Sequence, residues 1–93
     1  MVTRPCLVWN DENVAHIARH GVTPEDVEYL CAHEAYVERA GKGYFIYRGQ
    51  NRSGRYLMAV LDDLGNGVYY VVTARPLTRT ERSTLLRKWR RKE

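Results

Sequence analysis

The chain has 93 residues, of which 44% are hydrophobic and 28% charged, and its formal net charge is +4 at pH 7. This length suits one domain with a single hydrophobic core, and the apolar content favours folding over disorder. No apolar run approaches the roughly 18–20 residues that span a bilayer, and the first residues lack the apolar core of a secretory signal. We therefore expect one cytoplasmic domain over residues 1–93 that has no membrane partner.

The N-terminal part predicts a short strand followed by a helix. Cys6–Trp9 is an apolar strand, and Asn10 or Asp11 can cap the helix that follows. This helix is expected over about 11–20 and to end at Gly21, where the backbone turns left-handed. Its expected apolar stripe consists of Val14, Ile17 and Ala18.

A second helix is indicated by three agreeing signals at its start. Thr23 supplies a hydroxyl cap, Pro24 stands at the first helical position, and acidic residues fill the first turn. The predicted buried face consists of Val27, Leu30 and Cys31.

From Ala35 onward the hydrophobic period changes from helical to two residues. Four strands are predicted, and they are Ala35–Arg39, Tyr44–Arg48, Arg55–Leu61 and Val68–Arg75. Short glycine-rich connections between them favour an antiparallel meander.

A final helix is predicted from a capping box in which Thr78 and Glu81 satisfy each other's backbone N–H groups. Its apolar members are Leu85, Leu86 and Trp89. The order strand, two helices, four strands, helix predicts an α+β fold with the helices packed on one face of a small twisted antiparallel sheet.

The chain contains two cysteines. Cys6 and Cys31 lie far apart in apolar contexts, so we expect two small buried side chains rather than a metal site or a disulfide.

Basic residues cluster near the C-terminus, at Arg75, Arg79, Arg82, Arg87, Lys88, Arg90, Arg91 and Lys92. Such asymmetry indicates a polyanionic partner, although cations near a helix C-terminus also favour the helix dipole.

Arg75 is the best individual candidate for contact with an anion. It ends the strongly apolar strand Val68–Arg75, and a strand end fixes a side chain better than a loop does. The guanidinium is always charged and its planar fork of donors suits phosphate oxygens. An ion pair with Asp11 is the structural alternative.

Five short motifs follow one another along the chain. They are Trp9-Asn10-Asp11, Arg19-His20-Gly21-Val22, Gly54-Arg55, Val72-Thr73-Ala74-Arg75 and Glu81-Arg82. In this order and spacing they resemble the BrnT family of small toxins from bacterial toxin–antitoxin pairs. The resemblance covers nearly the whole chain and rests on the succession of motifs.

The resemblance implies a RelE-like α+β fold and ribonuclease activity that shuts down translation. It also implies a companion antitoxin with a ribbon-helix-helix DNA-binding part. The chain departs from the family pattern in the first helix, where Glu12 or Asn13 stands near a position that is commonly lysine. His16 likewise stands where asparagine is usual.

Metal-independent RNA cleavage needs a base, an acid and fixed positive charge, and the sequence offers each of them. His16 and His20 are four residues apart, which places them on one helix face, and an imidazole titrates at about pH 6.5. We expect Arg75 and Arg55 to stabilise the phosphate and either histidine to transfer protons. No cofactor is expected.

RNA binding is assigned to a further set of residues on the predicted strands and the last helix. Tyrosines can stack on unpaired bases and arginines can hold phosphates. The set is Arg48, Tyr47, Tyr70, Arg79 and Arg82.

Structural alternatives remain open for several of these residues. His20 before Gly21 also suits a helix C-terminal cap, and Arg55 also suits a cross-strand pair with Glu38 or Asp62. Glu12 with both histidines is a weak zinc pattern without a fourth ligand. A non-catalytic module that binds RNA or an acidic protein through the basic final helix is the main functional alternative.

Overall fold

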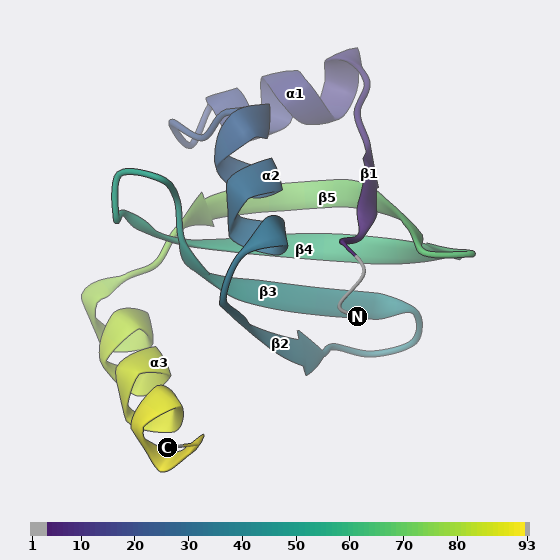
Figure 1. Ribbon diagram of the computed structural model, residues 1–93. Coiled ribbons are helices and arrows are strands. Elements are labelled where there is room, and N and C mark those ends of the chain that lie inside the picture. Colours follow the sequence, from purple (N-terminus) through teal and green to yellow (C-terminus); the bar gives the residue numbers. More distant parts are fainter. Residues whose placement is uncertain (1–3, 93) are drawn as a thin grey trace.

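Residues 4–92 are described by a computed structural model, and the side chains of Arg91 and Lys92 from the basic cluster lie outside the described part. The elements in chain order are β1 (Cys6–Val8), α1 (Asp11–Ala18), α2 (Pro24–Ala32), β2 (Ala35–Arg39), β3 (Tyr44–Gln50), β4 (Tyr56–Gly65), β5 (Val68–Pro76) and α3 (Arg79–Lys92). This order is the one that the sequence predicts, and it confirms the α+β class (Figure 1).

The strands form one sheet in the order β1-β5-β4-β3-β2. The four strands from β2 to β5 form the expected antiparallel meander, with Tyr47 opposite Ala59 and Ala59 opposite Ala74. β1 pairs with β5 in parallel, so the sheet is mixed rather than wholly antiparallel. The chain between β1 and β5, which contains α1, α2 and the strands β2 to β4, provides the long connection that a parallel pair needs.

One face of the sheet is covered by α1 and α2, and we call it the α1–α2 face. It holds the main hydrophobic core, because side chains that alternate along the strands meet the buried sides of both helices. The core consists of Ile17, Val22, Val27, Leu30, Cys31, Leu57, Ala59, Leu61, Val71 and Ala74.

The opposite face carries α3, and we call it the α3 face. Tyr36, Arg48, Met58 and Arg75 lie opposite one another on neighbouring strands and therefore point to the same side. Met58 and Leu85 of α3 are buried here, outside the main core. The prediction that all helices pack on one face is therefore wrong, because α3 crosses the other side of the sheet (Figure 1).

The predicted caps all form. Asn10 begins α1 in a reciprocal capping box with Asn13, and Thr23 begins α2 in the same way with Asp26. At α3 the Glu81 N–H donates to the Thr78 hydroxyl at 3.1 Å, and the Thr78 N–H donates to the Glu81 carboxylate at 2.8 Å. These local bonds fix where each helix begins.

The two cysteines differ in their surroundings. Cys31 is buried as predicted, and burial raises the pKa of its thiol to about 12. Cys6 is exposed on the short strand β1, which corrects the expectation that both are buried. None of the helices in the described residues is long and apolar enough to cross a bilayer.

Candidate functional site

The first helix is anchored along the border of β5. The Asn13 side-chain amide, which is only 2% exposed, donates to the Val8 carbonyl at 2.9 Å and to the Val71 carbonyl at 3.1 Å. These bonds satisfy strand carbonyls at the point where β1 stops covering β5. The helix therefore replaces a neighbouring strand along the rest of β5, and its outer side stays exposed.

His16 and His20 lie together on this exposed side of α1. The two rings meet edge to face with centroids 5.5 Å apart, as the spacing of four residues predicts. His16 Nε2 lies 2.9 Å from the Thr73 hydroxyl of β5. Thr73 and Arg75 are two residues apart on one strand and share the α3 face, so His16 reaches the rim of the face that carries Arg75.

The turn after α1 holds Arg55 at the residue that follows His20. Gly21 has φ +73 and its N–H donates to Ala18, while Val22 donates to Ile17, which closes the helix as predicted. The Arg55 guanidinium donates to the Gly21 carbonyl at 2.8 Å. Arg55 is therefore held next to the residue that follows His20, rather than in the alternative pair with Glu38 or Asp62.

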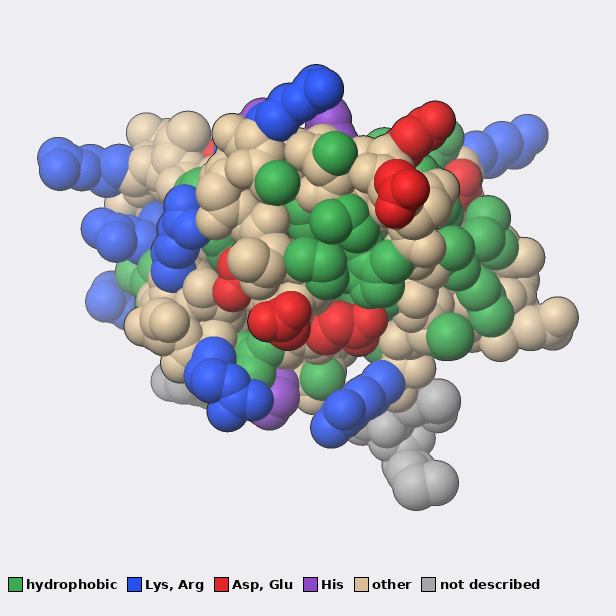
Figure 2. Space-filling view, turned by 90° about the horizontal axis from the view of Figure 1, so that it is seen from above, with side chains coloured by type: hydrophobic (Ala, Val, Ile, Leu, Met, Phe, Trp, Pro, Cys, Tyr) green, Lys and Arg blue, Asp and Glu red, His purple; other side chains and the backbone are tan. Residues whose placement is uncertain are grey.

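A basic groove of about 360 Å³ continues from Arg55 to the start of α3. Its lining residues are Gly54, Arg55, Tyr56, Pro76, Leu77, Thr78, Arg79 and Arg82. Three are arginines and none is acidic, and the Arg82 guanidinium lies 5.7 Å from the centre of the Tyr56 ring. In Figure 2 several Lys and Arg side chains project at the left end of the molecule. The start of α3 lies at the same end in Figure 1.

Arg75 is clamped by an acidic residue of α3. Its two terminal nitrogens each donate to one carboxylate oxygen of Glu81 at 2.8 Å, and one of them also donates to the Pro76 carbonyl at 3.0 Å. The bonds from Arg75 and from the Thr78 N–H lower the pKa of Glu81 to about 2, and the bond to Glu81 raises the pKa of Arg75. The partner is therefore Glu81, not Asp11, and two of the five guanidinium donors remain for a ligand.

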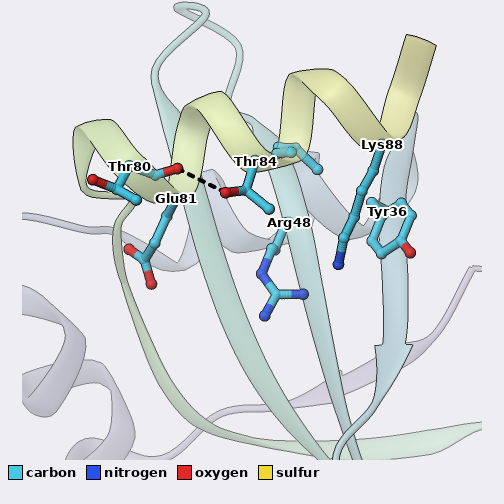
Figure 3. Close-up of a pocket in the computed structure, with 7 residues that line it drawn as sticks. Tyr36, Arg48, Thr80, Glu81, Thr84 and Lys88 are labelled. Atoms are coloured by element: carbon cyan, nitrogen blue, oxygen red, sulfur yellow. Dashed lines mark hydrogen bonds between the residues drawn. The ribbon is translucent and has the colours of Figure 1, made fainter. Parts of the chain in front are cut away.

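Arg48 lies deeper on the α3 face, in a cleft of about 150 Å³ between the sheet and α3 (Figure 3). It donates to Glu38 at 2.8 Å and, with Lys88, lowers the pKa of that carboxyl. Figure 3 places Arg48 between Glu81 at one end of the cleft and Lys88 with Tyr36 at the other. Arg48 therefore shares the α3 face with Arg75, and Met58 of β4 lies between them in the sheet.

The two tyrosines predicted to stack on bases have different positions. Tyr47 packs against the core on the α1–α2 face, where burial raises the pKa of its phenol. Its ring is therefore not on the side of the sheet that carries Arg48 and Arg75. Tyr70 lies on the α3 face and its hydroxyl donates to the Asn10 side chain at 3.4 Å.

Taken by location, the predicted residues form two adjoining groups and one outlier. His16, His20 and Arg55 follow the border of β5, and Arg79 and Arg82 extend that line into the basic groove. Arg75, Arg48 and Tyr70 lie on the α3 face. Tyr47 stands apart from both. Within the described part of the chain, no three His, Cys, Asp or Glu side chains gather as a metal-binding group.

Three residues make contacts at the site that the sequence analysis did not predict. Thr73 binds His16, Glu81 clamps Arg75, and Tyr56 supports Arg82. Thr73 and Glu81 belong to the motifs quoted above, but a partner many residues away, such as His16 for Thr73, leaves no local signal. Tyr56 follows Arg55 at the start of a strand, and only the placement of α3 reveals its contact.

A structural comparison finds a solved structure with a similar fold. The chain is similar to the crystal structure of the Brucella abortus ribonuclease toxin BrnT, with a TM-score of 0.64 and 17% sequence identity. The match covers 78% of this chain and 96% of that protein. No family model and no curated protein sequence matches the chain. At this identity the similarity shows the fold, and the protein has a BrnT-like fold.

Proposed function

We propose that this protein is the toxin of a toxin–antitoxin pair and that it cleaves RNA without a metal ion. The BrnT-like fold supports this proposal, since the similar protein is a ribonuclease toxin. The arrangement that carries it is local. Two exposed histidines have rings 5.5 Å apart, and Arg55 donates to the carbonyl of the residue that follows His20. The groove that Arg55 lines contains no acidic residue.

The histidine pair supplies the proton transfers. One imidazole accepts the proton of an RNA 2′-hydroxyl, and the 2′-oxygen then attacks the adjacent phosphorus. The other imidazole donates a proton to the 5′-oxygen as the P–O bond to it breaks. The products are a 2′,3′-cyclic phosphate and a 5′-hydroxyl end. Thr73 orients the His16 ring through its hydroxyl.

Positive charge stabilises the transition state from two sides. Arg55 is fixed by the Gly21 carbonyl, and Arg75 is held in a fixed orientation by Glu81 while two of its donors remain unused. Donors that are oriented before the reaction stabilise developing phosphate charge most effectively. Because Glu81 acts through Arg75, it is a positioning residue.

The RNA strand is assigned to the surface around this centre. Arg79 and Arg82 bind backbone phosphates in the basic groove, and Arg48 contributes charge on the α3 face. Tyr70 lies on that face and offers a ring to an unpaired base. Tyr47 is not part of this proposed surface, because it packs against the core on the other face of the sheet.

The proposed cellular role follows from cleavage of RNA in the cytoplasm. Loss of RNA integrity halts translation and growth, and a cognate antitoxin of the ribbon-helix-helix type prevents this. A companion protein that copurifies with the chain and suppresses its activity is the expected observation.

Expression in a bacterial host tests the proposal. Growth arrest with degraded RNA is expected, and His20→Ala should slow RNA cleavage by about 10²–10⁴-fold, the usual contribution of a positioned acid or base. Arg75→Ala should relieve the arrest. Arg52→Ala is the matched control, since Arg52 is exposed, lies over the Tyr29 ring and lines neither the basic groove nor the pocket that contains His16. Unimpaired growth with intact RNA would contradict the proposal.

A non-catalytic RNA-binding module is the second candidate, and the exposed cations Arg79, Arg82, Arg87 and Arg90 on α3 favour it. In that case RNA binds with an affinity that falls with log salt in proportion to the phosphates neutralised. The same purified protein then yields no cleavage product, which separates the two functions in one experiment.

A further inference from the structure

The strand β2 forms a free edge of the sheet. It is last in the strand order, and no described strand lies beyond it. The Ala40 N–H donates to the Tyr44 carbonyl at 2.9 Å, and hydrogen-bonded pairs alternate along an antiparallel ladder. Ala40, Glu38 and Tyr36 therefore point their backbone groups toward β3. Ala35, Val37 and Arg39 point theirs outward.

This edge is more open than the opposite edge of the sheet. On the other side of the sheet β1 is only three residues long, and α1 covers the adjoining stretch of β5 through Asn13. β2 contains no proline, and Val37 at its centre is 46% exposed on the α1–α2 face. Its charged residues are Glu38, which pairs with Arg48, and Arg39 at its end, so the outward groups around the central valine can serve as a template for another strand.

Cations lie near this edge on both faces of the sheet, and the acidic residues there are Glu34 before the strand and Glu38, which is paired with Arg48. α3 crosses the sheet from β4, where Arg82 lies over Tyr56, to β2, where the Lys88 ammonium lies 5.1 Å from the centre of the Tyr36 ring. Lys88 stands at the β2 end of the cleft in Figure 3. Arg87 and Arg90 are exposed on the same turns of the helix. On the other face, Arg39 ends the strand and is exposed.

We propose that β2 binds an extended acidic segment of a partner protein as a sixth strand. The outward groups of Ala35, Val37 and Arg39 bond its backbone, which is the usual basis of strand addition. An acidic residue opposite Tyr36 meets Lys88, an apolar residue opposite Val37 covers the exposed valine, and an acidic residue opposite Arg39 pairs with it. This surface is separate from the histidine pair, so the inference does not depend on the nuclease proposal.

Charge and backbone chemistry distinguish this occupant from two others. RNA has no alternating N–H and C=O groups with which to extend a ladder. A second copy of this chain would place two basic α3 helices next to each other across a β2–β2 pair, where like charges repel. An acidic peptide satisfies the edge and the cations together.

Amide-resolved NMR with the full chain tests the proposal. The probe is the capped peptide Thr-Glu-Thr-Val-Glu-Val-Thr, which in antiparallel register places its central valine opposite Val37 and its acids opposite Arg39 and Tyr36. We expect saturable binding that slows hydrogen exchange at the amides of Ala35, Val37 and Arg39. Those of Tyr36 and Glu38, already bonded to β3, should change little.

Two variants sharpen the result. Val37→Pro removes one outward donor without breaking a bond to β3, and it should abolish binding, whereas Val37→Thr should retain it. Lys88→Glu should weaken binding by about tenfold, in the range of charge-pair effects at interfaces. The proposal is overturned by absence of binding, by equal binding to Val37→Pro, by concentration-dependent self-association through β2, or by RNA that protects the same amides.

Discussion

The two faces of the sheet differ in what holds them together. On the α1–α2 face, Leu57, Leu61 and Val71 are fully buried among apolar neighbours. On the α3 face, Arg48 and Arg75 stand in ion pairs with side chains that remain 22–43% exposed. Stability therefore comes mainly from the first face. The second face can carry cations toward an anionic ligand because the fold does not depend on removing them from water.

Truncation of a core side chain tests this difference between the two faces and should give the largest change in the free energy of unfolding. Leu57→Ala should lower the free energy of unfolding by about 2–5 kcal/mol, because it leaves a cavity under α1 and α2. Leu86→Ala removes the same atoms from a half-buried position on α3 and should cost about 1 kcal/mol. Chemical denaturation measures both. Equal losses would mean that α3 is as important for stability as the main core.

Gly49 offers a second test on the α1–α2 face. A Cβ at this position would lie 2.8 Å from Leu30 Cδ1 and 3.1 Å from the Glu34 carbonyl oxygen. Gly49→Ala should therefore destabilise by about 1–3 kcal/mol through overpacking. Adding Leu30→Ala should recover part of this loss in a double-mutant cycle. Strict additivity of the two changes would show that the close approach of Leu30 is not the cause.

The clamp on the α3 face should have a smaller, pH-dependent effect. The pKa of Glu81 is lowered from its ordinary value of 4.5 to about 2, so its ionised form favours the folded state. This stabilisation is fully present above pH 4.5 and is lost as the pH falls through 2. Glu81→Gln should cost about 1 kcal/mol at neutral pH.

Denaturation of both proteins across this pH range gives the check. The wild type should approach the stability of Glu81→Gln as the pH falls. A difference that stays constant down to pH 2 would mean that the Glu81 charge does not contribute.

Of these substitutions, replacement of Arg79 in the basic groove should change the free energy of unfolding least. Arg79→Ala removes an exposed side chain and should change the free energy of unfolding by no more than about 0.5 kcal/mol. If Arg79 binds an RNA phosphate, the slope of log affinity against log salt should fall by about 0.7. Filter binding of single-stranded RNA at several salt concentrations measures this slope. An unchanged slope would remove Arg79 from the RNA surface.

The sequence predicts well those features that depend on neighbouring residues. The caps at Asn10, Thr23 and Thr78 form as expected, because each needs partners only three residues away. The placement of α3 could not be read in this way, since nothing local states which face of the sheet a terminal helix covers. Parallel pairing of β1 also depends on a distant strand, although the two intervening helices were compatible with it.

In the candidate site, too, contacts between residues close in sequence were predictable and contacts between distant residues were not. The spacing of His16 and His20 predicts their contact, because a helix fixes it. The ion pair of Arg75 with Glu81 required knowledge of how α3 turns back onto the sheet. The position of Tyr47 was predictable from the sequence, because Tyr47 and Arg48 are consecutive in a strand and must point to opposite faces of the sheet.

The chemical ends of the RNA fragments provide the most direct test of the account. Purified protein in the presence of a chelator should release fragments with 2′,3′-cyclic phosphate and 5′-hydroxyl ends, and His16→Ala and His20→Ala should both slow their release. Fragments with 3′-hydroxyl and 5′-phosphate ends, or cleavage that both histidine variants leave unchanged, would contradict the proposed role of the histidine pair.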